Sequence, residues 1–163
     1  MWLRKVLGND FFASVVVVWI GFNVTDDSLV HLETLVDLEK LRFWGKGISD
    51  AGIIHLRRLT RLKNLNLGGA AVTNAGLIHL SGLTNLQDLN LAETNVSDAG
   101  LDHLTAMTRL EQLSLTGTDV SDAGLLSLKG LVRLRILKLT NTNVTAAGVA
   151  ELQKVLPKCK IIR

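Results

Sequence analysis

The feature of this sequence that most constrains its fold is a unit of 24 residues that recurs six times without a slip. Each unit carries an aliphatic residue followed by Thr or Ser, at Val24, Ile48, Val72, Val96, Val120 and Val144. The motif continues with sequences such as Ser-Asp-Ala-Gly-Leu. A leucine pattern such as Leu86, Leu89 and Leu91 precedes it. A fixed period of this size is typical of solenoids, in which each unit packs on the next.

Each unit predicts a short strand followed by a helix. In Leu89-Asn90-Leu91 the alternation places the two leucines on one face of a strand. A helix of about nine residues is expected next, with inward residues at a spacing of three, as in Leu101, Leu104 and Met107. Its N-cap would be the Thr or Ser at 25, 49, 73, 97, 121 and 145. Glycines would allow a close approach to the neighbouring turn at 52, 76, 100, 124 and 148.

Stacking these units predicts an α/β solenoid with a parallel sheet on one side and helices on the other. Paired strands lie about 4.8 Å apart, whereas packed helices need about 8 to 10 Å between their axes. The stack must therefore bend into an arc with a concave sheet and convex helices. We expect six repeats over residues 14–157, an N-terminal cap over residues 1–13 and a capping strand over residues 158–163, with Ile161 pointing inward.

The repeat resembles that of the leucine-rich repeat proteins, and its 24-residue form looks like the bacterial GALA and F-box-associated types. The resemblance covers about residues 14 to 163 and includes the LxxLxL core at 62–67, 86–91, 110–115 and 134–139. It implies binding of a protein partner, usually on the concave face. An F-box adaptor needs a further module, so the chain would be at most its substrate-recognition piece. Thr94, Thr118 and Thr142 stand where many relatives carry a backbone-bonding Asn, which predicts a weaker or absent side-chain ladder at that edge.

The first third of the chain departs from the repeat because it holds all seven aromatic residues, at positions 2, 11, 12, 19, 22, 43 and 44. By the repeat register the first strand would be Val15 to Ile20, with Val17 and Trp19 inward and with Val16, Val18 and Ile20 on the concave side. Such an apolar strip needs a cover. Either the N-terminal segment shields the open end of the core, or the strip is a surface for a partner or for self-association.

No residue pattern predicts catalysis, a cofactor or a metal site. His31, His55, His79 and His103 share one repeat position, but equivalent positions on neighbouring helices lie too far apart for two imidazoles to share a zinc ion. Asp50, Asp98 and Asp122 recur in the first turn of a helix, where a negative charge suits the helix dipole. The single cysteine, Cys159, is expected to be a packed or edge residue, and the chain has no phosphate-binding loop or nucleophile elbow.

The predicted binding site is the concave face of the sheet. At its N-terminal end Lys40, Arg42 and Trp44 combine two cations with a large aromatic residue, a mixture enriched at interface hot spots. The outward positions of the next two strands complete the predicted site with Asn64, Asn66, Asp88 and Asn90. The alternative interpretation is that Trp44 packs under the N-terminal cap and the cations are only solvated. A second basic group, Arg57, Arg58, Arg61 and Lys63, is interpreted as a solvated edge.

These observations favour a non-enzymatic scaffold that binds a protein or peptide. The alternative is a structural fragment of a larger assembly, or one that self-associates through Val16, Val18 and Ile20. A net charge of +3 is weak support for a nucleic-acid partner, and the apolar run from Phe11 to Phe22 is too short to span a membrane. We expect a monomer or weak homo-oligomer in the cytoplasm, with secretion or a periplasmic location as alternatives.

Overall fold

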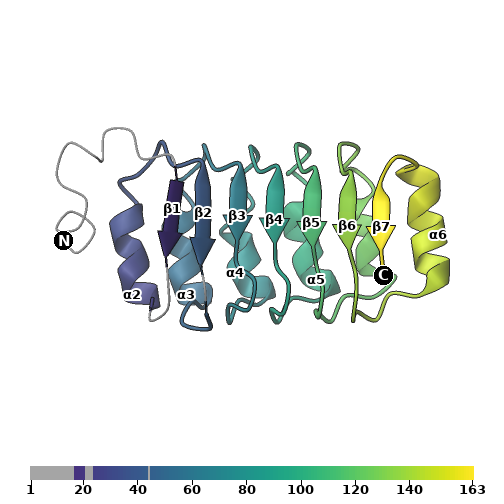
Figure 1. Cartoon of the computed structure of the whole chain (residues 1–163), viewed down its shortest axis with the longest axis horizontal. Coiled ribbons are helices and arrows are strands. Elements are labelled where there is room, and N and C mark those ends of the chain that lie inside the picture. Colours follow the sequence, from purple (N-terminus) through teal and green to yellow (C-terminus); the bar gives the residue numbers. More distant parts are fainter. Residues whose placement is uncertain (1–16, 21–23, 44) are drawn as a thin grey trace.

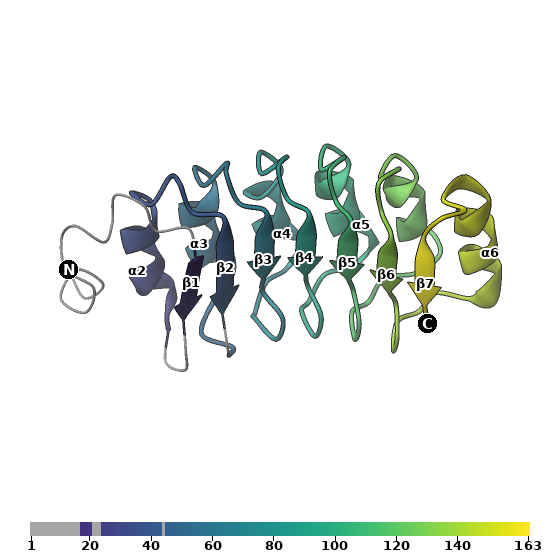
Figure 2. The same ribbon diagram turned by 45° about the horizontal axis from the view of Figure 1, so that its top comes forward.

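The chain folds into one parallel sheet with short helical segments packed against one of its faces. The computed structural model describes residues 17–20, 24–43 and 45–163. Seven strands lie side by side in chain order, and Figures 1 and 2 show the helical segments as a separate layer behind them. The strands are β1 (Val17–Ile20), β2 (Lys40–Phe43), β3 (Asn64–Asn66), β4 (Asp88–Asn90), β5 (Gln112–Ser114), β6 (Ile136–Lys138) and β7 (Lys160–Ile162). The predicted α/β solenoid is confirmed.

The 24-residue register holds from β2 to β7 but not at β1. Lys40 pairs with Asn64 and Ile136 pairs with Lys160, both at a spacing of 24, whereas Val17 pairs with Lys40 at a spacing of 23. The predicted orientation of the first strand is therefore wrong for both valines that can be judged: Val18 is buried and Val17 is 42% exposed. A one-residue shift turns every side chain of a strand to the other face. Val15, Val16 and the side chains of Trp19 and Ile20 lie outside what the structure describes.

The helical segments are shorter than the predicted nine residues, and several consist of an α-turn that runs into a 3-10 turn. The spacing of three between buried residues such as Leu101, Leu104 and Met107 explains this, because three residues per turn is the 3-10 period. Among the described helical segments, only the last reaches ten residues. The segments are α2 (Asp26–Leu29), η2 (Val30–Leu32), α3 (Asp50–Ile53), η3 (Ile54–Leu56), α4 (Asn74–Ile78), α5 (Asp98–Leu101), η4 (Asp102–Leu104), η5 (Gly124–Leu128) and α6 (Ala146–Val155).

Side-chain caps are present at four of the six predicted Thr and Ser positions. The hydroxyl oxygens of Ser49 and Thr73 accept from the backbone N–H two residues on, as does that of Ser121, and Thr145 accepts from Gly148. Thr25 and Ser97 make no side-chain cap. The prediction of capped helix starts is thus confirmed at four repeats and wrong at two.

The aspartates at the helix starts do more than face the helix dipole, because each one binds the next repeat. The carboxylate of Asp98 accepts from the backbone N–H of Ser121 at 2.7 Å and from its hydroxyl at 2.6 Å. The same two bonds join four of the five pairs that we call the inter-repeat clamps, namely Asp26–Ser49, Asp50–Thr73, Asp98–Ser121 and Asp122–Thr145. These charge-assisted bonds tie each turn to its neighbour.

The fifth clamp, Asn74–Ser97, explains why Ser97 does not cap its own helix. The Asn74 oxygen accepts from the Ser97 backbone N–H, but its amide nitrogen donates to the Ser97 hydroxyl oxygen at 2.8 Å. In the aspartate clamps the hydroxyl donates to the carboxylate. The hydroxyl oxygen is then oriented to accept from a backbone N–H of its own helix. An amide reverses that bond, and the side-chain cap is lost.

The recurring glycines provide room for these clamps. A Cβ built on Gly100 would lie 2.4 Å from the Asn74 Oδ1, and one on Gly124 would lie 2.4 Å from the Asp98 Oδ1. The predicted close approach is therefore confirmed, and the group that approaches is the clamp side chain of the preceding repeat. Any larger residue must displace that oxygen and with it the inter-repeat bonds.

The Asp122 clamp is expected to make the stability of the protein depend on pH in the acid range. The hydroxyl and backbone N–H of Thr145 lower the pKa of the Asp122 carboxyl below its ordinary value of 3.8. A lowered pKa in the folded state stabilises the protein above 3.8, and this contribution is lost as the pH falls through the folded-state pKa. The melting temperature of the wild type should therefore lie above that of Asp122→Asn at neutral pH. The difference between the two melting temperatures should disappear in acid. Thermal melts of both proteins from neutral to acid pH test this prediction. A difference in melting temperature that does not change with pH would contradict it.

The core is a set of aliphatic rows between the sheet and the helical layer. Leu41, Leu65, Leu89, Leu113 and Leu137 occupy equivalent inward strand positions and are buried. Shortly after the carboxyl ends of β4, β5 and β6, the hydroxyls of Thr94, Thr118 and Thr142 each donate to the carbonyl three residues earlier, at 2.6 Å. These threonines therefore bond within their own repeats, at the positions where many relatives carry a backbone-bonding Asn.

The last strand of the sheet is β7, which pairs with β6. β7 lies within the predicted segment 158–163, and Ile161 pairs with Leu137 and packs partly buried against the core. Cys159 is buried, and burial raises the pKa of its thiol, so it is a packed residue. The predicted N-terminal cap over residues 1–13 lies outside the described residues. In the part of the chain that the structure covers, no helix has the length and apolarity to cross a membrane.

Candidate protein-binding face

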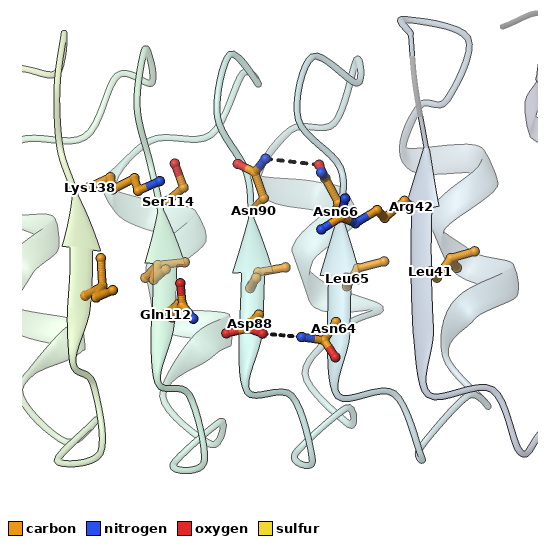
Figure 3. Close-up of a pocket in the computed structure, with 13 residues that line it drawn as sticks. Leu41, Arg42, Asn64, Leu65, Asn66, Asp88, Asn90, Gln112, Ser114 and Lys138 are labelled. Carbon is orange, nitrogen blue, oxygen red and sulfur yellow. Dashed lines mark hydrogen bonds between the residues drawn. The ribbon is translucent and has the colours of Figure 1, made fainter. Parts of the chain in front are cut away.

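The face of the sheet opposite the helical layer carries a groove of about 340 Å³ that crosses strands β2 to β6. The strands form its floor, with the buried inward leucines beneath them, and the outward strand residues line it, as Figure 3 shows. We call it the concave groove. The residues that line it are Leu41, Arg42, Asn64, Leu65, Asn66, Asp88, Leu89, Asn90, Gln112, Leu113, Ser114, Ile136 and Lys138.

Two asparagines in the groove are held in place by hydrogen bonds to each other and to the backbone. Asn90 Nδ2 donates to Asn66 Oδ1 at 3.0 Å, across two neighbouring strands. Asn66 Oδ1 also accepts from the Gly68 N–H, and Asn90 Oδ1 accepts from the Ala92 N–H. Both amide oxygens are therefore used within the protein. The amide nitrogens provide the remaining hydrogen-bond donors, and they are pre-oriented in the groove.

Asp88 is the only carboxylate among the residues that line the concave groove. It accepts a hydrogen bond from Asn64 Nδ2 on the neighbouring strand. Partial burial raises the pKa of Asp88, and the negative charge of Glu111 raises it further, while the bond from Asn64 and the charge of Lys40 act in the opposite direction. A carboxylate that is partly desolvated in this way gains from a cationic or hydrogen-bond-donating partner.

Cations lie at both ends of this groove. Arg42 on β2 extends over the face toward Asn66, and Lys138 on β6 extends toward Ser114 (Figure 3). Lys40 is exposed on the same face of β2 but is not among the residues that line the groove. Trp44, the third member of the predicted hot spot, lies outside the described residues.

The structure thus brings together five of the seven predicted site residues in one groove: Arg42, Asn64, Asn66, Asp88 and Asn90. The groove extends beyond the predicted residues, over Gln112, Ser114, Ile136 and Lys138. The repeat register already placed these residues on the same face. Whether any of these residues binds a partner stays a prediction.

The helical side holds the histidine row and the second basic group. His55 Nδ1 lies 2.7 Å from Glu33 Oε1, a contact that lowers the pKa of Glu33. Among the described residues, no three His, Cys, Asp or Glu side chains are grouped as metal ligands. In the basic group Arg61 pairs with Asp37 and Lys63 pairs with Glu39, both at 2.7 Å, and Arg57 and Arg58 are exposed.

The repeat, the parallel sheet and the helical layer define the class of fold: this chain is a leucine-rich repeat solenoid, and the comparisons with solved structures agree. An internalin C2 from Listeria monocytogenes is 26% identical over 76% of this chain and 51% of its own, with a TM-score of 0.60. A second internalin from the same species, InlF, is 26% identical over 98% of this chain and 53% of its own, with a TM-score of 0.69.

A leucine-rich repeat protein from Leptospira interrogans shares the fold at 17% identity, over 82% of this chain and 39% of its own, with a TM-score of 0.60. No family model and no curated protein matches the sequence. The chain spans about half the length of the two internalins, as their coverages show. All three neighbours are bacterial, which agrees with the bacterial type of repeat, while the narrower likeness to GALA and F-box-associated repeats stays a prediction.

Proposed function

We propose that this chain is a non-enzymatic scaffold that binds a protein or peptide partner in the concave groove. Leucine-rich repeat solenoids present extended concave surfaces that other proteins occupy. The observation that carries the proposal here is the combination of polar groups in the groove. Cations at both ends, a partly desolvated carboxylate and fixed amide donors offer both charge and hydrogen bonds to a partner.

The side-chain chemistry of the groove supports binding more than catalysis. No histidine or cysteine lines it, and the carboxylate of Asp88 is bonded to an amide rather than placed beside a nucleophile. Between its charged residues the groove presents neutral amides and a hydroxyl, which suit peptide groups; they belong to Asn64, Asn66, Asn90, Gln112 and Ser114. These groups also give the surface a rigid form, because they are bonded to the sheet that carries them.

The alternative of self-association through Val16, Val18 and Ile20 loses its central residue. Val18 faces the core, with only 6% of its surface exposed, so it is not available to a second copy. Val16 and the side chain of Ile20 lie outside the described residues. No other observation favours that alternative, so one function is proposed.

Affinity capture from a lysate of the source organism tests the proposed function. The wild type is compared with Arg42→Glu/Lys138→Glu, which reverses both groove cations, and with Lys129→Glu, a matched charge reversal on the helical side, where Lys129 is exposed. A protein retained by wild type and by Lys129→Glu but lost from the double variant would support the groove. Equal retention by all three would contradict it, provided that circular dichroism shows all three folded.

A further inference from the structure

We propose that the concave groove takes an extended peptide with two acidic side chains about six residues apart, on either side of an uncharged or basic centre. This inference rests on the proposed function and specifies the partner. It follows from where the charges of the groove lie and from how far apart the strands hold them.

The two groove cations occupy the same position in different repeats. The strand pairing runs from Arg42 through Asn66, Asn90 and Ser114 to Lys138, one residue per strand. Four steps of about 4.8 Å separate the first and last of these strands, which gives about 19 Å. An extended chain rises about 3.3 Å per residue, so a peptide lying along the groove covers that distance in about six residues.

Between these cations the groove is neutral except for one negative charge. Asn66, Asn90 and Ser114 fill the row between them, and the parallel row contains Asp88 between Asn64 and Gln112. An acidic residue at the centre of the peptide would face Asp88 and be repelled. A basic or hydrogen-bond-donating residue there would face it favourably, so the groove favours a peptide with the charge order acid, neutral or basic, acid.

The same charge order argues against a nucleic acid as the partner. A nucleic acid places phosphates at regular intervals, and some of them would lie over Asp88. Base stacking also needs aromatic side chains, and the sequence has none beyond Trp44, so strands β3 to β6 offer none. The side-chain amides of Asn66 and Asn90 instead match the carbonyl groups of a peptide backbone, because their nitrogens are the atoms left to donate.

Fluorescence anisotropy with synthetic peptides and the full chain tests the spacing. The probe is a labelled peptide with two aspartates about six residues apart and a central lysine, and its isomer has the same composition with the aspartates adjacent. Adjacent aspartates reach only one of the two cations, so the first peptide forms one more solvent-exposed ion pair than the isomer. This predicts up to about fivefold tighter binding of the first peptide. Lys138→Gln should remove most of this preference, whereas Lys129→Gln should leave it unchanged.

A charge swap makes the test independent of folding defects. Lys138→Glu should prefer a peptide in which the aspartate at that end is replaced by lysine, thereby reversing the wild-type order. Equal binding of the two isomers, no binding of either, or tighter binding of a single-stranded oligonucleotide would overturn the inference. The proposed function fails separately, when the captured cellular partner is retained by Arg42→Glu/Lys138→Glu.

Discussion

Gly148→Ala is expected to lower the free energy of unfolding by about 2 to 4 kcal/mol. A Cβ at this position would lie 2.0 Å from the Asp122 Oδ1 and 2.3 Å from its carboxyl carbon. Asp122 can avoid the methyl group only by leaving Thr145, and it then loses two hydrogen bonds of 2.7 and 2.6 Å. Intrinsic helix propensity alone would give the opposite sign, since alanine is the better helix former by about 1 kcal/mol.

Gly130→Ala is the matched control for this prediction. A Cβ on Gly130 would meet no atom within 4 Å, and this glycine does not adopt a positive φ. The same substitution should therefore be neutral, or stabilising by up to about 1 kcal/mol through the unfolded state. Urea unfolding of both variants measures the difference. Similar stabilities for the two would show that the clamps contribute little to the stacking of repeats.

Leu128→Ala is expected to cost about 2 to 5 kcal/mol, whereas Leu126→Ala in the same 3-10 turn should change stability by less than about 0.5 kcal/mol. Leu128 is 0% exposed and Leu126 is 60% exposed. Both residues belong to η5, so the pair compares burial within one short element. Truncating Leu128 leaves a cavity in the aliphatic core, while truncating Leu126 removes a side chain that is mostly in water.

Thermal and urea unfolding of these two variants would also test the assignment of this turn. If η5 were an α-helix with a different inward face, the two substitutions would have similar costs or the reverse order. A large loss for Leu126→Ala would therefore contradict the packing described here.

The sequence predicted the solenoid because its period is unambiguous where apolar and polar residues alternate. In Asn64-Leu65-Asn66 and Asp88-Leu89-Asn90 the leucine can only face the core, and the structure places both there. The first strand has no such alternation, since residues 15–18 are all valine. Nothing in that run fixes which face points inward, and the prediction extended the 24-residue spacing across a pair of strands that is offset by 23.

The helical layer was mispredicted although its signal was present. Leu77, Leu80 and Leu83 are buried at a spacing of three, which an α-helix of 3.6 residues per turn cannot keep on one face for long. The role of the aspartates was missed for another reason. Their partners, such as Ser121 for Asp98, lie 23 residues away and are brought close only by stacking of the repeats. A favourable interaction with the helix dipole already explained an acidic residue in the first turn of a helix.

The lining of the concave groove was predicted in part because outward strand positions follow from the register. Five predicted residues line the groove, but the prediction favoured the N-terminal end, where a cation cluster drew attention. Lys138 was on the same face in the sequence and stands opposite Arg42 across the groove (Figure 3). Its relation to Arg42 appears only when β2 to β6 are seen as one surface.

Site-specific photo-crosslinking with the captured partner tests the central claim most directly. A photoreactive residue at Ser114, inside the concave groove, is compared with one at Lys129 on the helical side. The account predicts a covalent adduct to the partner from position 114 and none from position 129. An adduct from position 129 alone would place the binding surface on the helical layer and contradict the proposed function.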